Sequence, residues 1–427
     1  MDTNSTTVNR FKMQVNKFSG ILAKKFSKTK KRFLKEMLYG IQASKDIKLS
    51  NVARALQEQI PLIKTEDRLS RNLNQEDLTS DINGEILRLS KDKIDKDIVI
   101  AIDPGEIMKP YARSMEKLCA IYDGSEKKPA QGYNLCQVTA ANLQQNKLVP
   151  LYNEVFSSEE EGYVDKTEKV KGIISRVAQI IGKSGTWAMD REGDDIGMIE
   201  HFEKEGLEFV IRLKLNRYVH YGHNTYRQVQ VDHIDRFVNL KYSTQVVKLE
   251  GDKIKTYTLK YGVVAVALPE APSQWYHLVI IRGFGKHPML LLTNKQINIH
   301  SQKALYTIIE IYLTRWKCEE CYRYIKQSYN LEDLRVRGYN AIRNIIVLVN
   351  AIAYFCSVYM GMAIKLKLLV NKIFILAKRF FGVPVFYNYA MADGIFEMLK
   401  STRSGIINFK GKIGLKGEEL QLSLFPD

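Results

Sequence analysis

Cysteine and histidine are scarce in this sequence, and their placement excludes several kinds of site. The 427 residues include five cysteines, an odd number that forms no disulfide framework and favours a reducing cytoplasm. Cys318 and Cys321 have the spacing of a zinc-binding pair, but no second pair completes the four ligands of a structural zinc site. The seven histidines show no metal-ligand spacing. We therefore expect no structural zinc.

Acidic residues are few relative to basic ones. The chain has 64 Lys and Arg against 47 Asp and Glu, which gives a formal net charge of +17. Residues 1–75 contain sixteen of these basic residues and six of the acidic ones. A charge of this sign and size favours a polyanionic partner, either nucleic acid or an anionic lipid surface.

Long hydrophobic runs are nearly absent. The N-terminus, MDTNSTTVNR, lacks the apolar core of a signal peptide. One run, IIVLVNAIAYFCSVYMGMAI at residues 345–364, would just span a bilayer, but Asn350 and Ser357 interrupt it. We expect a helix buried inside a large domain and no membrane association. A membrane-associated basic protein is the most distant alternative.

Residues 1–97 are expected to form a helical DNA-binding domain. Apolar residues recur at helical spacing through residues 11–26 and 32–41. Ser50 is suited to cap a helix that Pro61 would stop, and a second short helix follows. Two short helices about a tight turn suggest a helix-turn-helix, although many helical bundles share this pattern. Three polar side chains of the second helix would face outward toward DNA: Arg68, Arg71 and Asn72.

Residues 98–215 alternate between strands and helices. DIVIAIDPGE opens with an apolar run, which predicts a buried strand ending at Asp103. Two more strands, a helix, a strand ending at Asp190, a short helix and a last strand follow. This order is that of the ribonuclease-H-like fold, in which acidic residues lie on the first strand and at the end of the fourth. We therefore expect an α/β core with a mixed sheet flanked by helices.

The pattern of apolar residues changes twice in the rest of the chain. Residues 216–298 alternate Val, Ile, Tyr and Thr, which predicts an all-β insertion made of hairpins. Helical periodicity returns in residues 299–364, the expected second part of the core. Residues 365–427 are basic and mixed, and KLKLLVNKIFILAKRFF at residues 365–381 is their most helical part.

The stretch YLTRWKCEECYRYIK, residues 312–326, predicts a helix with one distinctive face. At about 100° per residue, four side chains fall within about 60° of one another: Tyr312, Arg315, Glu319 and Lys326. Glu320 is turned about 100° from Glu319, and Cys318 and Cys321 point away from this face. Taken alone, such a face is more often simply solvated.

Three carboxylates occupy elements that a core sheet could bring together: Asp103, Asp190 and Glu319. Carboxylates at adjacent strand ends repel each other unless a cation joins them, and Mg²⁺ prefers oxygen ligands. Two such ions about 3.5–4 Å apart can activate a water or a 3′-hydroxyl and stabilise the leaving oxygen of a phosphodiester. Each residue also has an ordinary interpretation. Asp103 could be a turn residue before Pro104, Asp190 a helix cap, and Glu319 part of a solvated face.

These motifs resemble those of the DDE transposases of bacterial insertion sequences. Tyr312-x2-Arg315-x3-Glu319-x6-Lys326 resembles their Y-R-E-K signature. MDREGDD resembles the block around their second aspartate, and IAIDPGEIMKPYA the block around the first. A β-rich insertion between the second aspartate and the glutamate also occurs in this family. The resemblance covers about residues 45–360.

The resemblance implies cut-and-paste transposition. The protein would bind the terminal inverted repeats of its element, cleave the 3′ ends with two Mg²⁺ or Mn²⁺ ions, and join them to target DNA. Asp103, Asp190 and Glu319 would be the catalytic metal ligands. Four side chains would hold DNA phosphates: Tyr312, Arg315, Lys326 and Arg191.

The resemblance also implies partners and a location. The protein would act on double-stranded DNA as at least a homodimer, in the bacterial cytoplasm and associated with the nucleoid. Two alternatives stay open: a catalytically inactive transposase-derived DNA-binding protein, and a metal-dependent nuclease without strand transfer.

One position departs from the family pattern. Members that cleave through a DNA hairpin place a tryptophan of the insertion against a flipped base. In this sequence Met289, in PMLLLTN, stands where that tryptophan is expected. Trp275, one strand earlier, is the candidate that could stack on a base instead.

Overall fold

The N-terminal region of the computed structural model is helical, and the chain is described over residues 3–124, 126–143, 148–221, 227–250, 253–360, 373, 387–400, 405–407 and 409. Five helices come first: α1 (Thr3–Leu22), α2 (Lys28–Ser44), α3 (Leu49–Leu56), α4 (Leu62–Gln75) and α5 (Thr79–Ser90). Pro61 stands at the N-cap of α4, where its missing N–H costs nothing. The predicted pair of short helices about a turn is therefore α3 and α4, but the predicted cap is wrong: Lys48, not Ser50, is the N-cap of α3, which ends at Leu56, before Pro61.

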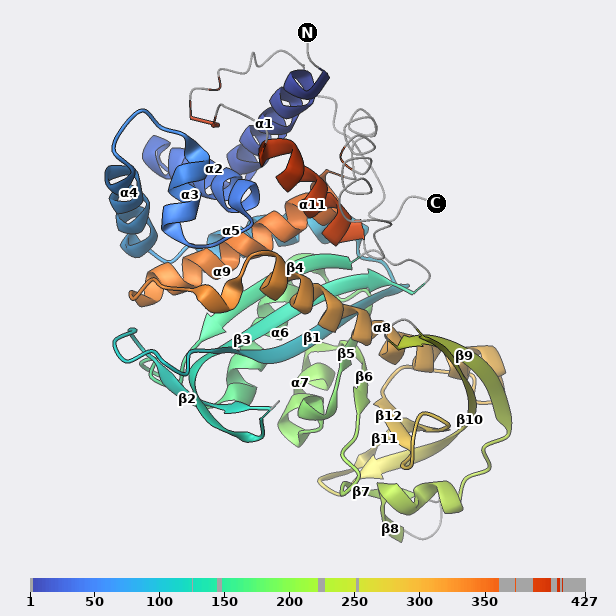
Figure 1. Ribbon diagram of the computed structural model, residues 1–427. Helices are drawn as coiled ribbons and strands as arrows, with labels where there is room; N and C mark the ends of the chain where they lie inside the picture. Colours follow the sequence, from blue (N-terminus) through green and yellow to red (C-terminus); the bar gives the residue numbers. More distant parts are fainter. Residues whose placement is uncertain are drawn as a thin grey trace.

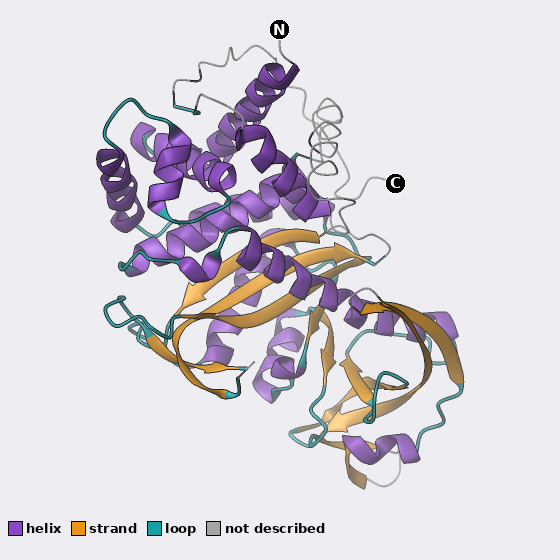
Figure 2. Ribbon diagram, in the orientation of Figure 1, coloured by secondary structure: helices purple, strands orange, loops and turns teal. Residues whose placement is uncertain are grey.

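The central sheet is mixed and has helices on its faces (Figures 1 and 2). Its elements along the chain are β1 (Ile98–Met108), β2 (Cys119–Asp123), β3 (Lys128–Asn142), β4 (Leu148–Phe156), α6 (Lys166–Ile181), β5 (Thr186–Met189), α7 (Ile196–Glu205) and β6 (Glu208–Arg212). Among the described residues of this segment, β2 is the only strand that the predicted order lacks. In the sheet, β4 and β2 pair with β3, and the order continues β3-β1-β5-β6. β1, β5 and β6 are parallel, and β3 is antiparallel to β1.

The first strand is longer than the sequence predicts. β1 pairs with β3 from Ile98 opposite Asn142 to Met108 opposite Gly132. The expectation that this strand ends at Asp103 is therefore wrong, because the partner strand supplies backbone hydrogen bonds well past the Pro104–Gly105 turn signal. By contrast, β5 ends at Met189, so Asp190 follows the strand directly, as predicted.

The β-rich segment continues the central sheet. Its strands are β7 (Tyr218–Tyr221), β8 (Arg227–Gln230), β9 (Tyr242–Glu250), β10 (Lys253–Leu268), β11 (Ala271–Arg282) and β12 (Met289–Thr293). β12 pairs with β6 of the core, antiparallel, with Leu292 opposite Ile211. The insertion therefore shares one hydrogen-bonded sheet with the core, and it curls away at the end of the molecule opposite the N-terminal helices (Figure 1).

Three further helices complete the described chain: α8 (Gln302–Ser328), α9 (Tyr339–Tyr354) and α11 (Tyr387–Lys400). One helix, Tyr339–Tyr359, is long and apolar enough to cross a membrane, but 94% of its most apolar window is buried inside the protein. This burial agrees with the expected core helix. The predicted C-terminal helix over residues 365–381 lies outside the described residues, apart from Ile373.

The N-terminal helices and the core share one hydrophobic cluster. Buried side chains of α2, α4 and α5 belong to the same cluster as those of β4 and α9. Asn344 of α9 is fully buried and ties the α4–α5 connection to the core. Its Oδ1 accepts from the backbone N–H of Leu78 at 2.7 Å, and its Nδ2 donates to the carbonyls of Leu73 and Glu76.

Candidate active site

Asp103 and Asp190 lie side by side on the two neighbouring parallel strands. The last residue pair between β1 and β5 is Ala101 opposite Ala188, and each aspartate follows two residues later. Because parallel strands keep their register, the two carboxylates emerge at the same level of the sheet. This is the juxtaposition that the sequence predicts.

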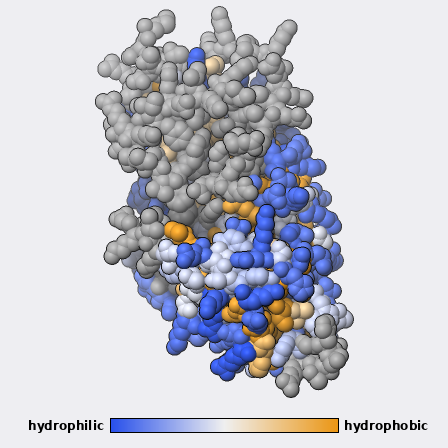
Figure 3. Space-filling view, turned by 90° about the vertical axis from the view of Figure 1, so that its right-hand side faces the viewer, coloured by the Kyte–Doolittle hydropathy of each residue, from blue (hydrophilic) through white to orange (hydrophobic). Residues whose placement is uncertain are grey.

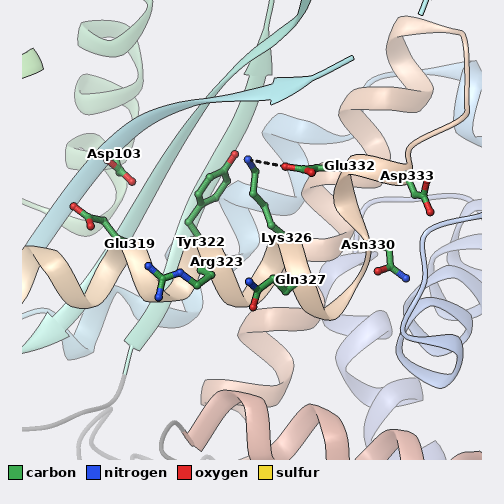
Figure 4. Close-up of a pocket in the computed structure, with 9 residues that line it drawn as sticks. All are labelled: Asp103, Glu319, Tyr322, Arg323, Lys326, Gln327, Asn330, Glu332 and Asp333. Carbon is green, nitrogen blue, oxygen red and sulfur yellow. Dashed lines mark ion pairs between the residues drawn. The ribbon is translucent and has the colours of Figure 1, made fainter. Parts of the chain in front are cut away.

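Helix α8 crosses the sheet above these strands and brings a third carboxylate. Glu319 projects into the same pocket as Asp103 (Figure 4). Arg315, one turn earlier, donates from Nη2 to Glu319 Oε1 at 2.8 Å, and its Nη1 lies 3.9 Å from Asp103 Oδ1. The guanidinium therefore joins two of the three carboxylates.

The Y-R-E-K side chains differ in exposure although they share one helix. Tyr312 and Arg315 are buried, and the guanidinium of Arg315 lies 5.2 Å from the ring centroid of Tyr312. Among the described residues, the Tyr312 hydroxyl and the Arg315 Nε have no hydrogen-bond partner. Lys326 instead lines the open pocket. Lys326 is therefore accessible to a DNA phosphate. For Tyr312 and Arg315 the phosphate contact stays a prediction, and their buried side chains would first have to become exposed.

Burial and like charges act together on Asp103. Burial raises the pKa of Asp103 to about 7; Arg315 opposes this rise, whereas Asp190, Glu319 and Glu192 add to it. Three neighbouring carboxylates therefore act on Asp103 against Arg315, which is the electrostatic condition of a cation site.

The donor chemistry fits a hard divalent ion, but the described side chains are not closed around one. Carboxylate oxygens are the ligands that Mg²⁺ and Mn²⁺ take. No group of three acidic, histidine or cysteine side chains within the described chain is close enough to hold a metal ion. Because Arg315 binds Glu319, that carboxylate would have to turn toward Asp103 and Asp190 to complete the set.

We predict a pH-dependent stability from Asp103. Its folded pKa of about 7 lies above its ordinary value of 3.8, so ionisation is penalised in the folded protein only. The penalty is absent below the lower value and complete above the upper one, so stability contributed by this group falls as pH rises between them. In EDTA, Asp103→Asn should unfold at a higher temperature than the unaltered protein at about pH 8, and at the same temperature at about pH 4. Equal melting temperatures at both pH values would contradict the raised pKa.

Asp190 also has the ordinary role that its sequence allows. Its Oδ1 accepts from the backbone N–H of Glu192 at 2.9 Å and caps a short 3-10 turn, Arg191–Gly193. The true helix cap of α7 is Asp195. Arg191 is exposed beside the carboxylates, so its predicted phosphate contact is sterically open.

The pocket contains side chains that sequence reasoning missed. It has a volume of about 730 Å³ and is lined by Asp103, Glu319, Tyr322, Arg323, Lys326, Gln327, Asn330, Glu332 and Asp333 (Figure 4). Tyr322 and Arg323 lie three and four residues after Glu319, so helical spacing could have identified them. Glu332 and Asp333 come from the turn after α8, where no periodic signal exists.

Two of the three outward residues predicted for the N-terminal helices are otherwise engaged. Asn72 is buried and donates to the carbonyl of Arg68, so its outward placement is wrong. Arg68 of α4 forms ion pairs with Glu36 of α2 at 2.9 Å and with Glu58, in the turn after α3, at 2.7 Å. The error arises because the tertiary contacts of α4 decide which face is outside. Arg71 is exposed, and its DNA contact stays a prediction.

The two candidates for base stacking lie on neighbouring strands of the β-rich segment. Met289, on β12, is buried, whereas Trp275, on β11, is 38% exposed. The surface at this end of the molecule is mainly hydrophilic with small hydrophobic areas (Figure 3). Only Trp275 of the two is therefore placed where a base could reach it.

Comparison with known proteins adds a family to this geometry. Residues 166–356 match the family model of the transposase DDE domain, a span that includes Asp190 and Glu319 and begins after Asp103. No curated protein sequence matches the chain. A solved piggyBac transposase in a synaptic complex with hairpin DNA is similar at 11% identity and a TM-score of 0.32, over 84% of this chain. The chain spans 64% of that transposase chain. Residues 166–356 thus carry a transposase DDE domain match, which confirms the resemblance to DDE transposases that the sequence motifs predict.

Proposed function

We propose that this protein is a transposase that cuts its element out of double-stranded DNA and joins it to a target. The observation that carries the proposal is the placement of Asp103 and Asp190 on adjacent parallel strands, with Glu319 of α8 in the same pocket as Asp103. The match to the transposase DDE domain supports it, because that match includes the last two of these residues. The bacterial insertion-sequence context belongs to the same proposal.

We also propose that the core is ribonuclease-H-like. The strand order β3-β1-β5-β6, with β1, β5 and β6 parallel and β3 antiparallel, supports this assignment. So does the position of the aspartates, one on the first strand and one directly after β5. Such a sheet is rigid, so its neighbouring central strands can hold two carboxylates at a fixed separation.

In this proposal, some side chains bind metal ions and others bind DNA phosphates. Asp103, Asp190 and Glu319 would hold two Mg²⁺ or Mn²⁺ ions, which when bound activate a water or 3′-hydroxyl and stabilise the leaving oxygen. Arg315 holds Glu319 by a hydrogen bond of 2.8 Å, and this carboxylate would turn toward Asp103 and Asp190 to bind the ions. Lys326 and Arg191 would bind phosphates on either side of the scissile bond as charged donors.

The DNA partner and the assembly follow from the same proposal. A net charge of +17 favours binding to a polyanion with strong salt dependence. Two element ends must be brought together before they are joined, so we propose at least a homodimer in the DNA complex, in the bacterial cytoplasm and near the nucleoid.

A strand-transfer assay tests this function. The protein is mixed with Mg²⁺, a supercoiled plasmid and labelled DNA that ends at the border of its own element with a free 3′-hydroxyl. We expect label to become covalently joined to the plasmid, and EDTA to prevent this. Metal-dependent cleavage of the labelled DNA or the plasmid without joining would instead identify a nuclease.

The exposed Trp275 gives a prediction about the second strand. If a flipped base stacks on its ring, Trp275→Ala should reduce hairpin formation at the cut end by about tenfold or more and leave first-strand nicking intact, since base–aromatic stacking contributes about 1–3 kcal/mol. Denaturing gels separate the two products. Met289→Ala provides the comparison in the buried neighbour. If the unaltered protein forms no hairpin, the second strand is cut by another route.

A further inference from the structure

The turn after α8 carries two carboxylates that line the active-site pocket, and each of them pairs with a lysine. Glu332 Oε1 lies 3.2 Å from Lys326 Nζ, and Asp333 Oδ2 lies 2.5 Å from Lys48 Nζ. Lys326 belongs to α8, about two helical turns beyond Glu319. Lys48 is the N-cap residue of α3. The two ion pairs therefore connect the helix that carries Glu319 to the N-terminal helices.

The members of each pair differ in exposure. The side chains of Glu332 and Asp333 are 62% and 51% exposed, whereas those of their lysine partners are 23% and 24% exposed. The lysine stems are thus held by the protein, and the carboxylates face water. Exposed pairs of this kind stabilise a fold little. Either carboxylate can therefore leave its lysine when a stronger anion arrives.

Hydrogen bonds from a buried lysine hold the backbone of the same turn. Lys109 is buried, and its Nζ donates to the carbonyls of Glu332 and Leu334, the latter at 3.0 Å. Leu331 is buried as well. Displacement of the two carboxylates would therefore be a rotation of side chains about a fixed turn, which is fast and needs no unfolding.

Basic side chains lead from the pocket to the N-terminal helices, with acidic side chains among them. Asp333 lines the active-site pocket, and its partner Lys48 lines a second hollow of about 520 Å³ between α3, α4 and the segment before α9. The exposed Arg335 and Arg337 also line this hollow, together with the acidic Glu66 and Asp67. Lys326, Lys48 and the two arginines thus mark a path from Glu319 to the N-terminal helices.

We propose that Lys326 and Lys48 bind two backbone phosphates of the DNA strand that leaves the active site, and that Glu332 and Asp333 occupy these phosphate positions in the DNA-free protein. The acidic turn then acts as an internal competitor, which DNA displaces as it enters the pocket. The inference rests on the proposed function, since it needs DNA at the carboxylates. It moves the contact of the N-terminal helices from Arg68 and Asn72 to Lys48.

Fluorescence anisotropy with a short labelled duplex from the flank of the protein's own gene, in EDTA, tests the competition. Asp333→Asn and Glu332→Gln remove the charge and keep the shape. We expect the double variant to bind about fivefold more tightly at low salt, and Lys48→Gln to bind about fivefold more weakly. Asp333→Asn should add nothing once Lys48 is replaced, because the carboxylate then has no lysine to release.

Glu208→Gln is the matched control. Glu208 is 48% exposed and pairs with Lys295, which is 23% exposed, so the pair resembles Glu332–Lys326 in burial and charge. It stands opposite Thr186 at the beginning of the parallel strands, away from the aspartates at their other end. This variant should bind DNA as the unaltered protein does. Melting temperatures confirm that all variants are folded.

Three results would overturn the inference. Glu208→Gln could raise the affinity for DNA as much as the acidic-turn variants do, or the acidic-turn variants could leave that affinity unchanged. The third is that Asp333→Asn raises the affinity fully even in the Lys48→Gln protein. The proposed function is tested separately by metal-dependent cleavage and joining. Joining with no coupling between Asp333 and Lys48 rejects this inference alone. Coupling without cleavage or joining rejects transposition and leaves the DNA path supported.

Discussion

Asp103→Ala and Asp190→Ala should each abolish DNA cleavage, with a loss of at least about a thousandfold, while DNA binding survives. Each variant removes one of two carboxylates that adjacent parallel strands place at the same level of the sheet. It also removes negative charge from a site where Asp103 already has a pKa raised by burial and by its acidic neighbours. Affinity for DNA should therefore stay equal or increase.

Asp97→Ala is the control for these variants. Asp97 is exposed and directly precedes β1, at the end of the strand opposite Asp103. It should cleave at the normal rate. Nicking and binding are measured on the same labelled flank DNA. Cleavage by Asp103→Ala or Asp190→Ala within about tenfold of the normal rate would reject the assignment of these residues as catalytic ligands.

Asn344→Ala should cause a large loss of stability away from the active site. The buried amide satisfies three backbone groups of the connection between α4 and α5: the N–H of Leu78 and the carbonyls of Leu73 and Glu76. Leaving buried backbone groups without partners costs about 1–3 kcal/mol each, so the total should be at least about 3 kcal/mol. A clear fall of the urea midpoint measures it.

Asn340→Ala is the same substitution one turn earlier on α9. Asn340 makes one long hydrogen bond of 3.4 Å to the carbonyl of Asn74 in an exposed setting. It should change stability by less than about 1 kcal/mol. Equal urea midpoints for the two variants would show that Asn344 does not anchor the N-terminal helices to the core.

The sequence predicted best where a local period controls the structure. The helical period places Glu319 on the face that enters the pocket with Lys326, and α8 has them there. The apolar run before Asp190 identified a strand that ends directly before it. In both cases the determinant lies within about one element of the residue concerned.

Prediction was weakest where contacts with a segment distant in the sequence determine the structure. β1 continues past Asp103 because β3 pairs with it, and Asn72 is buried because of the way α4 packs. The pairing of β12 with β6 joins the insertion to the core sheet, although the texture of the sequence indicated a separate block. The acidic turn at Glu332 becomes meaningful only because the fold brings lysines to it.

Incubation of the protein with end-labelled DNA from the flanks of its own gene, with and without Mg²⁺, tests whether the three carboxylates form a transposase active site. We expect a 3′-end nick at a defined position on each flank, present with Mg²⁺ or Mn²⁺, absent in EDTA and absent for Glu319→Ala. A protein that binds this DNA tightly but yields no metal-dependent nick would contradict this expectation.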